Sequence, residues 1–370
     1  MSLAFACGVI LSWRLWTSAR LFPCVSIIPS LPRIPFPFDY VLLVTLVALL
    51  IATAIFASRA CVFTTLTTVA LLAAFDQMRW QPWCYQYFFM IVALGFAAGK
   101  RSADKNSRLM VNACALILVS IYFWSGVEKL NAAFIKETWP DFSRPLFHWL
   151  LRSGTAPSYL ALAIPSLEIL IAMGFLTRRF RKVSTIVAIS SHALILIFLV
   201  VARENTVVWP WNIAMGLLVL AVFWQNEEIS VRRNLTVKHP AYVLIFILFA
   251  ILPALNLFGV WDSYLSFALY SGNNFEAVIF IDPASRDQLP SSLAPYIWHE
   301  SEPMFLDINR WSFGELNVPV YPEPRVFRRV AQTACELAHH DRGLKLMIKD
   351  QPDLLTGHRE DEYYDCDHLQ

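Results

Sequence analysis

The stretch that decides the fold is FDQMRWQPWCYQYFF, Phe75–Phe89, which lies between two apolar runs. It places Asp76, Gln77, Arg79 and Gln81 among aromatic residues, at a point where a membrane protein usually has a bland connector. The runs on either side predict membrane helices. The polar and aromatic residues between them predict that this turn forms part of the wall of a binding pocket.

The composition of the chain is typical of a membrane protein. Of 370 residues, 57% are hydrophobic and 16% are charged, and the mean hydropathy is +0.50. Soluble domains usually carry about 25% charged residues. The long apolar blocks predict an all-α polytopic membrane bundle of about nine spans. The spans are expected near residues 3–20, 38–57, 60–76, 83–100, 109–128, 157–177, 183–202, 207–224 and 240–259.

Charge separates the membrane part from the C-terminal part of the chain. Residues 1–260 carry 21 Lys/Arg and 10 Asp/Glu, a net +11, whereas residues 261–370 carry 9 and 18, a net −9. We therefore expect a transmembrane domain over 1–260 and a small α+β soluble region over 261–350. The acidic residues 351–370 are expected to form a disordered tail.

Local patterns add three expectations. The stretch DSYLSFALYSGN (262–273) looks strand-like, and RVFRRVAQTACELAHH (325–340) looks helical. The Pro-rich segment PCVSIIPSLPRIPFPF (23–38) cannot form a regular helix, because proline lacks a backbone donor, and is expected to lie as a loop over one face. The soluble region either takes part in function or merely caps the bundle.

Basic clusters set the expected orientation, because short cytoplasmic loops are enriched in Lys and Arg. The clusters are KRSADKNSR (100–108), TRRFRK (177–182) and RRNLTVK (232–238). Alternation of nine spans then places the N-terminus in the cytoplasm and the acidic C-terminal region outside. No cleavable signal peptide is evident, so residues 3–20 are expected to remain as a span, although Arg14 interrupts them.

The polar-aromatic segments of the membrane part then share the outer face. They are 76–83, 125–131 and 202–212, the last of which contains Trp209 and Asn212. Segments on one face can converge, so we expect them to contribute to a single outward-opening pocket that holds a small hydrophobic ligand.

Lys129 is the candidate general base. It lies 21 residues after Arg108, about 31 Å along a helix, and so is expected near the outer boundary of the hydrocarbon. Burial in an apolar pocket favours the neutral form of a lysine, which can then accept a proton near neutral pH. The alternative is a lysine that extends to the interface. Glu128 is expected to point elsewhere, because adjacent helical residues do not share a face.

The opening stretch supplies further candidates for the ligand site. Asp76 and Arg79 have i,i+3 spacing and are expected to pair. Trp80, Trp83, Tyr85 and Tyr87 could line a flat aromatic slot. The alternative is an interfacial aromatic belt with one ion pair that tethers the turn.

Three other ionisable residues lie in or beside apolar stretches. Glu168 lies early in its span and His192 near the middle of its own, where ionisable groups usually face the bundle interior. Each is either functional or forms a hydrogen bond that holds helices together. His148 lies on a short amphipathic outer segment and is expected at the interface.

Other classes of site find little support in the sequence. The seven cysteines include no C-x-x-C pair, which argues against a zinc or dithiol site. Cys335 with His339 and His340 is a weak alternative metal group, and we expect no metal. The basic loops lack interleaved aromatics, so no nucleic-acid binding is expected.

The motifs FDQMRWQPWCYQY, YFWSGVEKLN and SHALILIFL…VVWPWNIAM, in this order, resemble the horizontally transferred transmembrane domain family. This family shares its membrane fold with vitamin K-dependent gamma-carboxylase. The resemblance covers about residues 3–225. It implies that Lys129 deprotonates a hydroquinone, that His192 belongs to the same site, and that the site opens on the outer side.

The implied reaction adds oxygen to the quinol, generates a strong base and ends in carboxylation. The sequence departs from the carboxylase in three respects. Trp83 stands in place of a histidine, Glu128 in place of a second lysine, and about 110 residues in place of the large lumenal domain. Carboxylation of protein glutamates is therefore not carried over.

Three functions remain open from the sequence. The first is a quinol-dependent membrane enzyme with Lys129 as base. The second is a non-catalytic binder of quinone or lipid, or a partner subunit of a redox system. The third, a transporter, lacks the paired broken helices expected of one. The membrane is expected to be a bacterial inner membrane.

Overall fold

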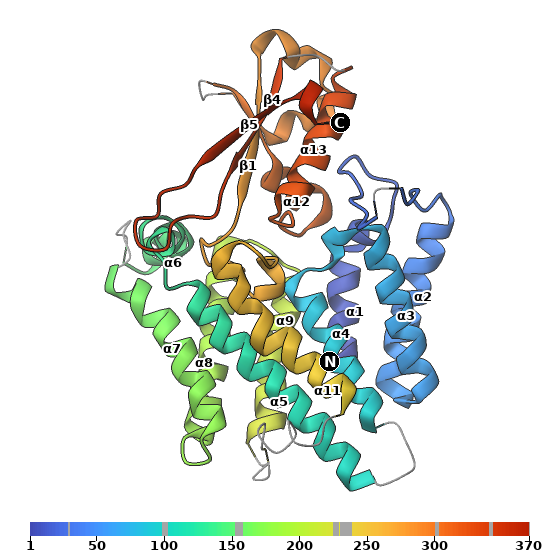
Figure 1. Ribbon diagram of the computed structural model, residues 1–370, viewed down its shortest axis with the longest axis vertical. Helices are drawn as coiled ribbons and strands as arrows, with labels where there is room; N and C mark the ends of the chain where they lie inside the picture. Colours follow the sequence, from blue (N-terminus) through green and yellow to red (C-terminus); the bar gives the residue numbers. More distant parts are fainter. Residues whose placement is uncertain are drawn as a thin grey trace.

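The computed structural model places a helical bundle at one end of the molecule and a small antiparallel sheet at the other (Figure 1). It describes residues 1–28, 30–97, 103–151, 158–224, 229, 239–299, 303–339 and 343–369. The predicted basic cluster 232–238 lies outside these residues, as do residues 100–102 and His340.

The bundle consists of apolar helices that run roughly along its long axis (Figure 1). Those that correspond to the predicted spans are α1 (Ser2–Leu11), α2 (Phe38–Phe56), α3 (Arg59–Phe75), α4 (Pro82–Ala97), α5 (Ala103–Glu128), α7 (Ser158–Leu176), α8 (Arg181–Ala202), α9 (Val208–Phe223) and α11 (Pro240–Phe246). The last continues as a π-helical turn over Ile247–Ile251 and a 3-10 helix over Leu252–Phe258, where Pro253 prevents the regular pattern.

Five of these helices are long and apolar enough to cross a membrane, so the chain reads as a multi-pass membrane protein. They are Phe38–Phe56, Asn106–Glu128, Tyr159–Leu176, Arg181–Ala202 and Pro240–Phe258. The shorter apolar helices are Ser2–Leu11, Arg59–Phe75, Pro82–Phe96 and Val208–Phe223. Nine complete crossings therefore stay a prediction.

The prediction that residues 3–20 cross as one helix is wrong. Helix α1 ends at Leu11, and a 3-10 turn over Trp13–Trp16 comes after it. A helix of 10 residues spans only about 15 Å, about half of the hydrocarbon thickness. The N-terminus accordingly lies at mid-height in the bundle (Figure 1). The predicted Pro-rich loop is confirmed between this turn and α2.

Helix α5 is the centre of the bundle. Its membrane-length window is 72% buried, compared with 22–33% for the four other long helices. It packs against α4, α7, α9 and α11. Because these neighbours surround α5, a residue at its end is held among several other elements.

The C-terminal region is a five-stranded antiparallel sheet of order β2-β3-β1-β4-β5, covered by two helices. The elements are β1 (Glu276–Ile281), β2 (Ile297–Trp298), β3 (Phe305–Asp307), α12 (Ile308–Leu316), α13 (Pro324–Leu337), β4 (Leu344–Lys349) and β5 (Asp361–Asp365). Along β1, Ile279 and Ile281 are buried while Glu276 is exposed, the alternation expected of a strand. The predicted helix over 325–340 is confirmed as α13.

Two expectations for this region are wrong. Residues 262–273 form turns and a short 3-10 helix rather than a strand. The acidic end is not a disordered tail, because Asp361–Asp365 pairs with β4 as the edge strand β5. Cys366 after it is bonded to Cys335 of α13, and this disulfide holds the charged end of the chain to the sheet.

The predicted outer loops all contact the C-terminal region. Gln81 Nε2 donates to the carbonyl of Pro319 at 3.1 Å, and Asn131 Nδ2 donates to the carbonyl of Ser271 at 2.9 Å. Asn317 Nδ2 donates to Thr206 Oγ1 at 2.9 Å. The three loops therefore lie at one end of the bundle, as expected.

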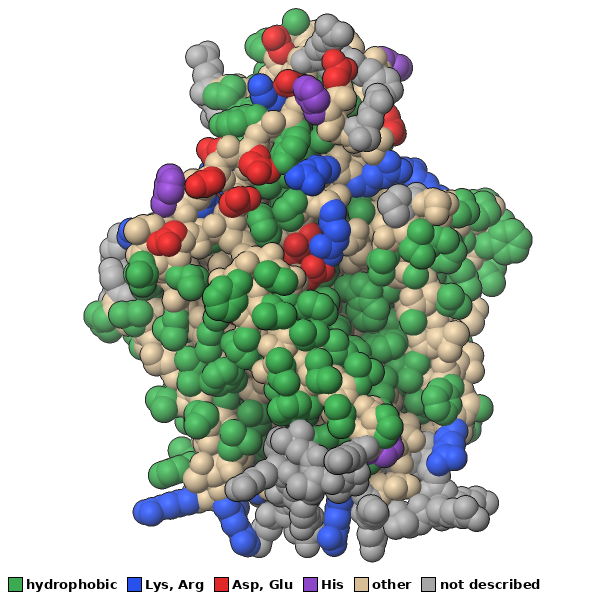
Figure 2. Space-filling model, viewed as in Figure 1, with side chains coloured by type: hydrophobic (Ala, Val, Ile, Leu, Met, Phe, Trp, Pro, Cys, Tyr) green, Lys and Arg blue, Asp and Glu red, His purple; other side chains and the backbone are tan. Residues whose placement is uncertain are grey.

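Charge is distributed along the axis of the molecule. In Figure 2, the coloured acidic side chains lie over the C-terminal region, a wide hydrophobic belt comes next, and basic side chains mark the opposite end. The turn between α7 and α8 carries Arg178 and Arg179, and Lys182 lies in the first turn of α8. This basic turn and the acidic sheet region are thus separated by the apolar part of the bundle.

Glu323, just before α13, is expected to make stability depend on pH. Burial, together with the nearby charge of Asp262, raises its pKa from 4.5 to about 7, although the Ser263 amide and Arg325 partly offset this. The Glu323 carboxyl group thus binds its proton more tightly in the folded protein than in the unfolded chain. The free energy of unfolding should fall as pH rises from about 4.5 to 7, by about 3 kcal/mol.

The measurement is the unfolding midpoint of the purified protein in detergent between pH 4.5 and 8. In Glu323→Gln the free energy of unfolding should fall less as pH rises, and above pH 7 it should exceed that of the original protein, because the glutamine amide is never charged. Glu336→Gln, at an exposed position of α13, controls for the loss of one carboxylate. A Glu323→Gln profile parallel to that of the original protein would contradict the assignment.

Candidate functional site

A cavity of about 210 Å³ lies within the bundle near the end that faces the C-terminal sheet. Its walls come from α5, α6 (Trp139–Leu151), α7, α8, α9 and the segment 267–270. Most of the lining is aliphatic or aromatic. The polar lining residues are Tyr122, Ser125, Lys129, Thr138, Glu168, Ser191, His192, Asn212 and Tyr270. Four residues predicted for the site are among them: Lys129, Glu168, His192 and Asn212.

Lys129 and Glu168 form an ion pair in this cavity. Lys129 Nζ lies 2.9 Å from Glu168 Oε2 and 3.2 Å from Oε1. It also donates to Ser125 Oγ at 2.5 Å and to the Ser125 carbonyl at 3.0 Å. The side chains are 10% and 17% exposed. The lysine was expected alone in an apolar pocket, but the structure gives it a carboxylate partner.

The close approach of α5 and α7 brings this pair together. Gly126 makes the approach possible, because a Cβ there would lie 2.7 Å from the carbonyl oxygen of Pro165. Pro165 lies inside α7, one turn before Glu168. Small residues at such contacts let membrane helices pack backbone to backbone. Glu168 therefore reaches the end of α5 across this contact.

His192 is the centre of a second chain of hydrogen bonds. Its Nε2 lies 2.6 Å from Tyr122 Oη and its Nδ1 lies 2.8 Å from Asn212 Oδ1. Asn212 Nδ2 donates to the Val208 carbonyl, so Oδ1 is the atom left to accept from the histidine. A neutral His192 then carries its hydrogen on Nδ1 and accepts from the Tyr122 hydroxyl at Nε2.

One wall of the cavity faces the surroundings of the bundle. Leu167 of α7 and Leu194 of α8 line it and are 41% and 50% exposed. Apolar side chains exposed at this depth of a membrane bundle contact lipid tails. This wall therefore presents apolar side chains to the outside of the bundle.

The opening stretch contributes only Pro82 to the lining of this cavity, and the predicted Asp76–Arg79 pair is wrong. The Asp76 carboxylate pairs instead with Arg20 Nη2 at 2.5 Å and accepts from the amides of Val25 and Met78. Arg79 donates to the carbonyl oxygens of Leu15 and Leu72. Both residues anchor the segment after α1 to the turn between α3 and α4.

The aromatic residues of this stretch pack inside the protein rather than forming a slot. Trp83 and Tyr87 lie against Phe5 of α1, with ring centroids 5.8 and 5.5 Å away. Tyr85 stacks on Phe249 at 4.8 Å. Trp80 contacts Tyr85 and Phe88 edge to face. These rings fill the space between α1, α4 and α11. A sequence pattern alone cannot distinguish aromatic residues packed in a core from aromatic residues that line a ligand pocket.

Glu128 and Trp209 also lie away from the cavity lining. Glu128 points in another direction than Lys129, as expected, and its Oε2 accepts from Asn256 at 2.9 Å and Asn273 at 2.6 Å. Trp209 Nε1 donates to the carbonyl of Glu204 at the start of α9. Glu128 thus ties the end of α5 to the segment that leads into the sheet.

Sequence reasoning missed Tyr122 and Ser125. Both belong to α5 and precede Lys129 by seven and four residues, so that all three share one helix face. This spacing was a usable signal. Tyr270, which also lines the cavity, comes from a turn whose position depends on the tertiary fold, and its hydroxyl accepts from Asn205.

The remaining candidates lie elsewhere. His148 is exposed on α6, which crosses the outer end of the bundle and appears almost end-on in Figure 1. The thiol of Cys335 is used in the disulfide, so it is not a metal ligand. Among the described residues, no group of three or more His, Cys, Asp or Glu could hold a metal ion.

Comparison of the chain with known protein families, curated proteins and solved structures finds no match.

Proposed function

We propose that this protein is a quinol-dependent membrane enzyme whose embedded cavity binds a flat hydrophobic ligand with an ionisable hydroxyl. The observation that supports this best is the pairing of Lys129 with Glu168 in an otherwise apolar cavity that also contains Tyr122 and His192. Ionisable residues at this depth in a bundle usually serve function. A quinol in this site supplies the acidic hydroxyl and the reducing electrons.

In this proposal Lys129 and Glu168 act together as the proton acceptor. A ligand hydroxyl that displaces Ser125 from Lys129 Nζ can give its proton to the Glu168 carboxylate, while the Lys129 ammonium stabilises the oxyanion that remains on the ligand. Tyr122, held by His192 and Asn212, presents a second hydroxyl to the same cavity. Apolar walls exclude water and so strengthen both interactions.

We further propose that the chain belongs to the horizontally transferred transmembrane domain family and lies in a bacterial inner membrane, with the sheet region outside. Two features at opposite ends of the molecule support this orientation. The Cys335–Cys366 disulfide is typical of an oxidising compartment. The basic turn Arg178–Lys182 is typical of a cytoplasmic loop.

The second candidate is a non-catalytic binder of quinone or lipid. It is favoured by the hydrogen bonds that the polar groups already make. Lys129 Nζ has acceptors in the Ser125 hydroxyl, the Ser125 carbonyl and the Glu168 carboxylate, and both ring nitrogens of His192 have partners. A site built only to hold helices together would have the same bonds. The two candidates differ in what the ligand does after it binds.

Quinone retention tests the proposal. The protein is purified in mild detergent and extracted with organic solvent, and the extract is analysed by mass spectrometry. We expect near-stoichiometric quinone with the original chain and with Trp80→Ala, because Trp80 does not line the cavity. Ile195→Trp, which fills the cavity from α8, should lose it.

Lys129→Met then separates the two candidates. If Lys129→Met retains quinone but loses quinol-dependent oxygen uptake, the result supports the enzyme. If neither the original protein nor any variant takes up oxygen, the result supports the non-catalytic binder. An extract that holds only phospholipid with every variant contradicts a quinone site of either kind.

A further inference from the structure

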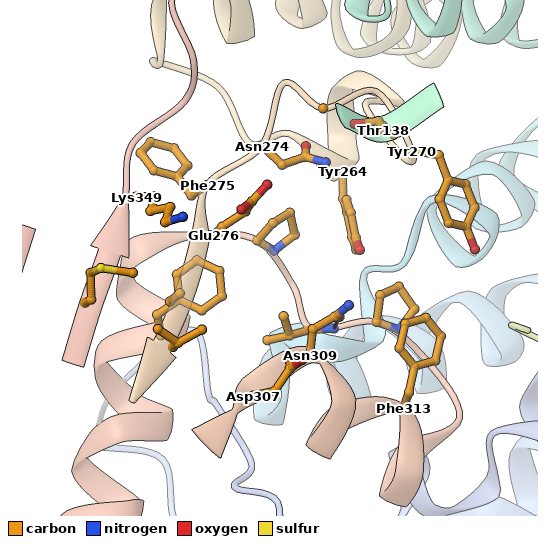
Figure 3. A pocket seen from close by; sticks show the side chains of 18 of the residues that line it. Thr138, Tyr264, Tyr270, Asn274, Phe275, Glu276, Asp307, Asn309, Phe313 and Lys349 are labelled. Atoms are coloured by element: carbon orange, nitrogen blue, oxygen red, sulfur yellow. Dashed lines mark hydrogen bonds between the residues drawn. The ribbon is translucent and has the colours of Figure 1, made fainter. Parts of the chain in front are cut away.

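A second cavity, of about 580 Å³, lies between the sheet and the outer end of the bundle. Figure 3 shows its side chains arranged around the open space, with Glu276 and Lys349 on the side of the strands, Asn309 and Phe313 on α12, and Tyr270 opposite the strands. It shares Thr138, Leu269 and Tyr270 with the inner cavity. These three residues are therefore the partition between the two spaces.

Charges of both signs lie on the face of the sheet that lines this outer cavity. Lys349 of β4 pairs in register with Glu276 of β1, and Val278 pairs with Asp307 of β3. Alternate residues of a strand share a face, so Glu276 and Val278 point the same way. Lys349, Glu276 and Asp307 thus form one diagonal row across three adjacent strands.

The charged groups of this row have donors and acceptors that no described residue engages in a hydrogen bond. Glu276 Oε1 accepts from Arg359 at 3.1 Å and Asp307 Oδ1 accepts from the Arg310 amide at 2.9 Å. The other oxygen of each carboxylate has no donor within the described part of the chain. Asn274 Oδ1 is buried without a partner. The ammonium of Lys349 has no acceptor among the described residues.

The rest of the wall is aromatic. It includes Tyr264, Tyr270, Phe275, Phe280, Phe305, Phe313 and Phe327. Aromatic faces attract cations, and they do so more strongly in a partly enclosed site. The net charge of −9 over residues 261–370 also favours a cation and disfavours a ligand that is only anionic.

We propose that the outer cavity binds a small zwitterionic group, with its ammonium between Glu276, Asp307 and the aromatic wall and its anionic group at Lys349. The group is either a free solute or the headgroup of a membrane lipid. This site does not depend on what the inner cavity binds, so quinone binding and zwitterion binding can fail separately.

Two probes distinguish the sources of the group. Free phosphoethanolamine is titrated into the full chain in detergent by calorimetry. Dioleoylphosphatidylethanolamine is offered in nanodiscs, against dioleoylphosphatidylglycerol, and bound lipid is counted by native mass spectrometry. Binding of the free probe assigns a soluble ligand, and retention of the ethanolamine lipid alone assigns a headgroup.

Glu276→Gln, Asp307→Asn and Lys349→Met should each weaken the probe that binds by about tenfold, since each removes one charge-assisted contact. Asn can still cap α12, so Asp307→Asn leaves the helix start intact. Glu362→Gln and Lys345→Met change charges of the same sheet outside the cavity and should bind like the original protein. Sheet integrity is checked by thermal unfolding of each variant.

Three results would overturn the proposal. One is that neither ethanolamine probe binds. Another is that glycerol phosphate, or the glycerol lipid, binds as well as its ethanolamine counterpart, which would remove the role of the ammonium. The third is that the cavity variants bind like Glu362→Gln and Lys345→Met.

Discussion

Replacing Lys129 with methionine is expected to lower the free energy of unfolding by about 3–5 kcal/mol, the cost of leaving one member of a buried ion pair alone. Glu168 would lose the ammonium that lies 2.9 Å away, while its side chain stays 17% exposed. Its negative charge would then face an apolar cavity. The measurement is the unfolding midpoint in detergent, converted to free energy with the enthalpy of each variant.

The double variant Lys129→Met/Glu168→Gln is the matched control. It removes both charges and should recover most of the loss, because a neutral polar pair is less costly to bury than a single charge. Together with the single variant Glu168→Gln, these proteins complete a double-mutant cycle, which gives the coupling free energy between positions 129 and 168. Equal stability of the original chain and Lys129→Met would show that the pair does not exist as described.

The second large effect is expected at Asp76. The side chains of Asp76 and Arg20 are each 1% exposed, and the carboxylate also accepts from the amides of Val25 and Met78. Asp76→Ala would leave the buried Arg20 guanidinium without its carboxylate, with only backbone carbonyl oxygens as acceptors, and two amides without their acceptor, at a cost of about 3–5 kcal/mol. Denaturant unfolding in detergent measures this loss.

Asp141→Ala is the control for this variant. Asp141 pairs with Arg144 on the exposed side of α6, where the side chains are 71% and 62% exposed. A surface pair of this kind contributes at most about 1 kcal/mol. Similar losses for Asp76→Ala and Asp141→Ala would contradict the anchoring role assigned to Asp76.

The elements that were predicted well are those whose cause is local. Long apolar runs such as Phe38–Phe56 and Arg181–Ala202 form helices because a bilayer leaves the backbone no other partner than itself. The amphipathic pattern of α13 depends only on the helical period. The Pro-rich segment 23–38 fails to form a helix for an equally local reason.

The elements that were predicted wrongly depend on partners far along the chain. Asp361–Asp365 is acidic enough to be disordered by itself, but β4 pairs with it and the bond from Cys366 to Cys335 retains it. Helix α1 is shorter than its apolar run, and the turn after it is held by Arg20, which donates to the carbonyl oxygens of Arg14 and Leu15 and pairs with Asp76. Neither partner is visible in a local window.

The sequence by itself determined that this is a helical membrane protein, and it identified Lys129, Glu168, His192 and Asn212, because ionisable and amide groups in apolar runs are rare and costly. Only the tertiary structure decided which groups meet. Glu168 meets Lys129 across the contact at Gly126, and Asp76 pairs with Arg20 rather than with its near neighbour Arg79. The physical reason is that helix packing, rather than spacing along the chain, sets the distance between charged groups, so that the same residue types become a cavity wall at one place and a buried anchor at another.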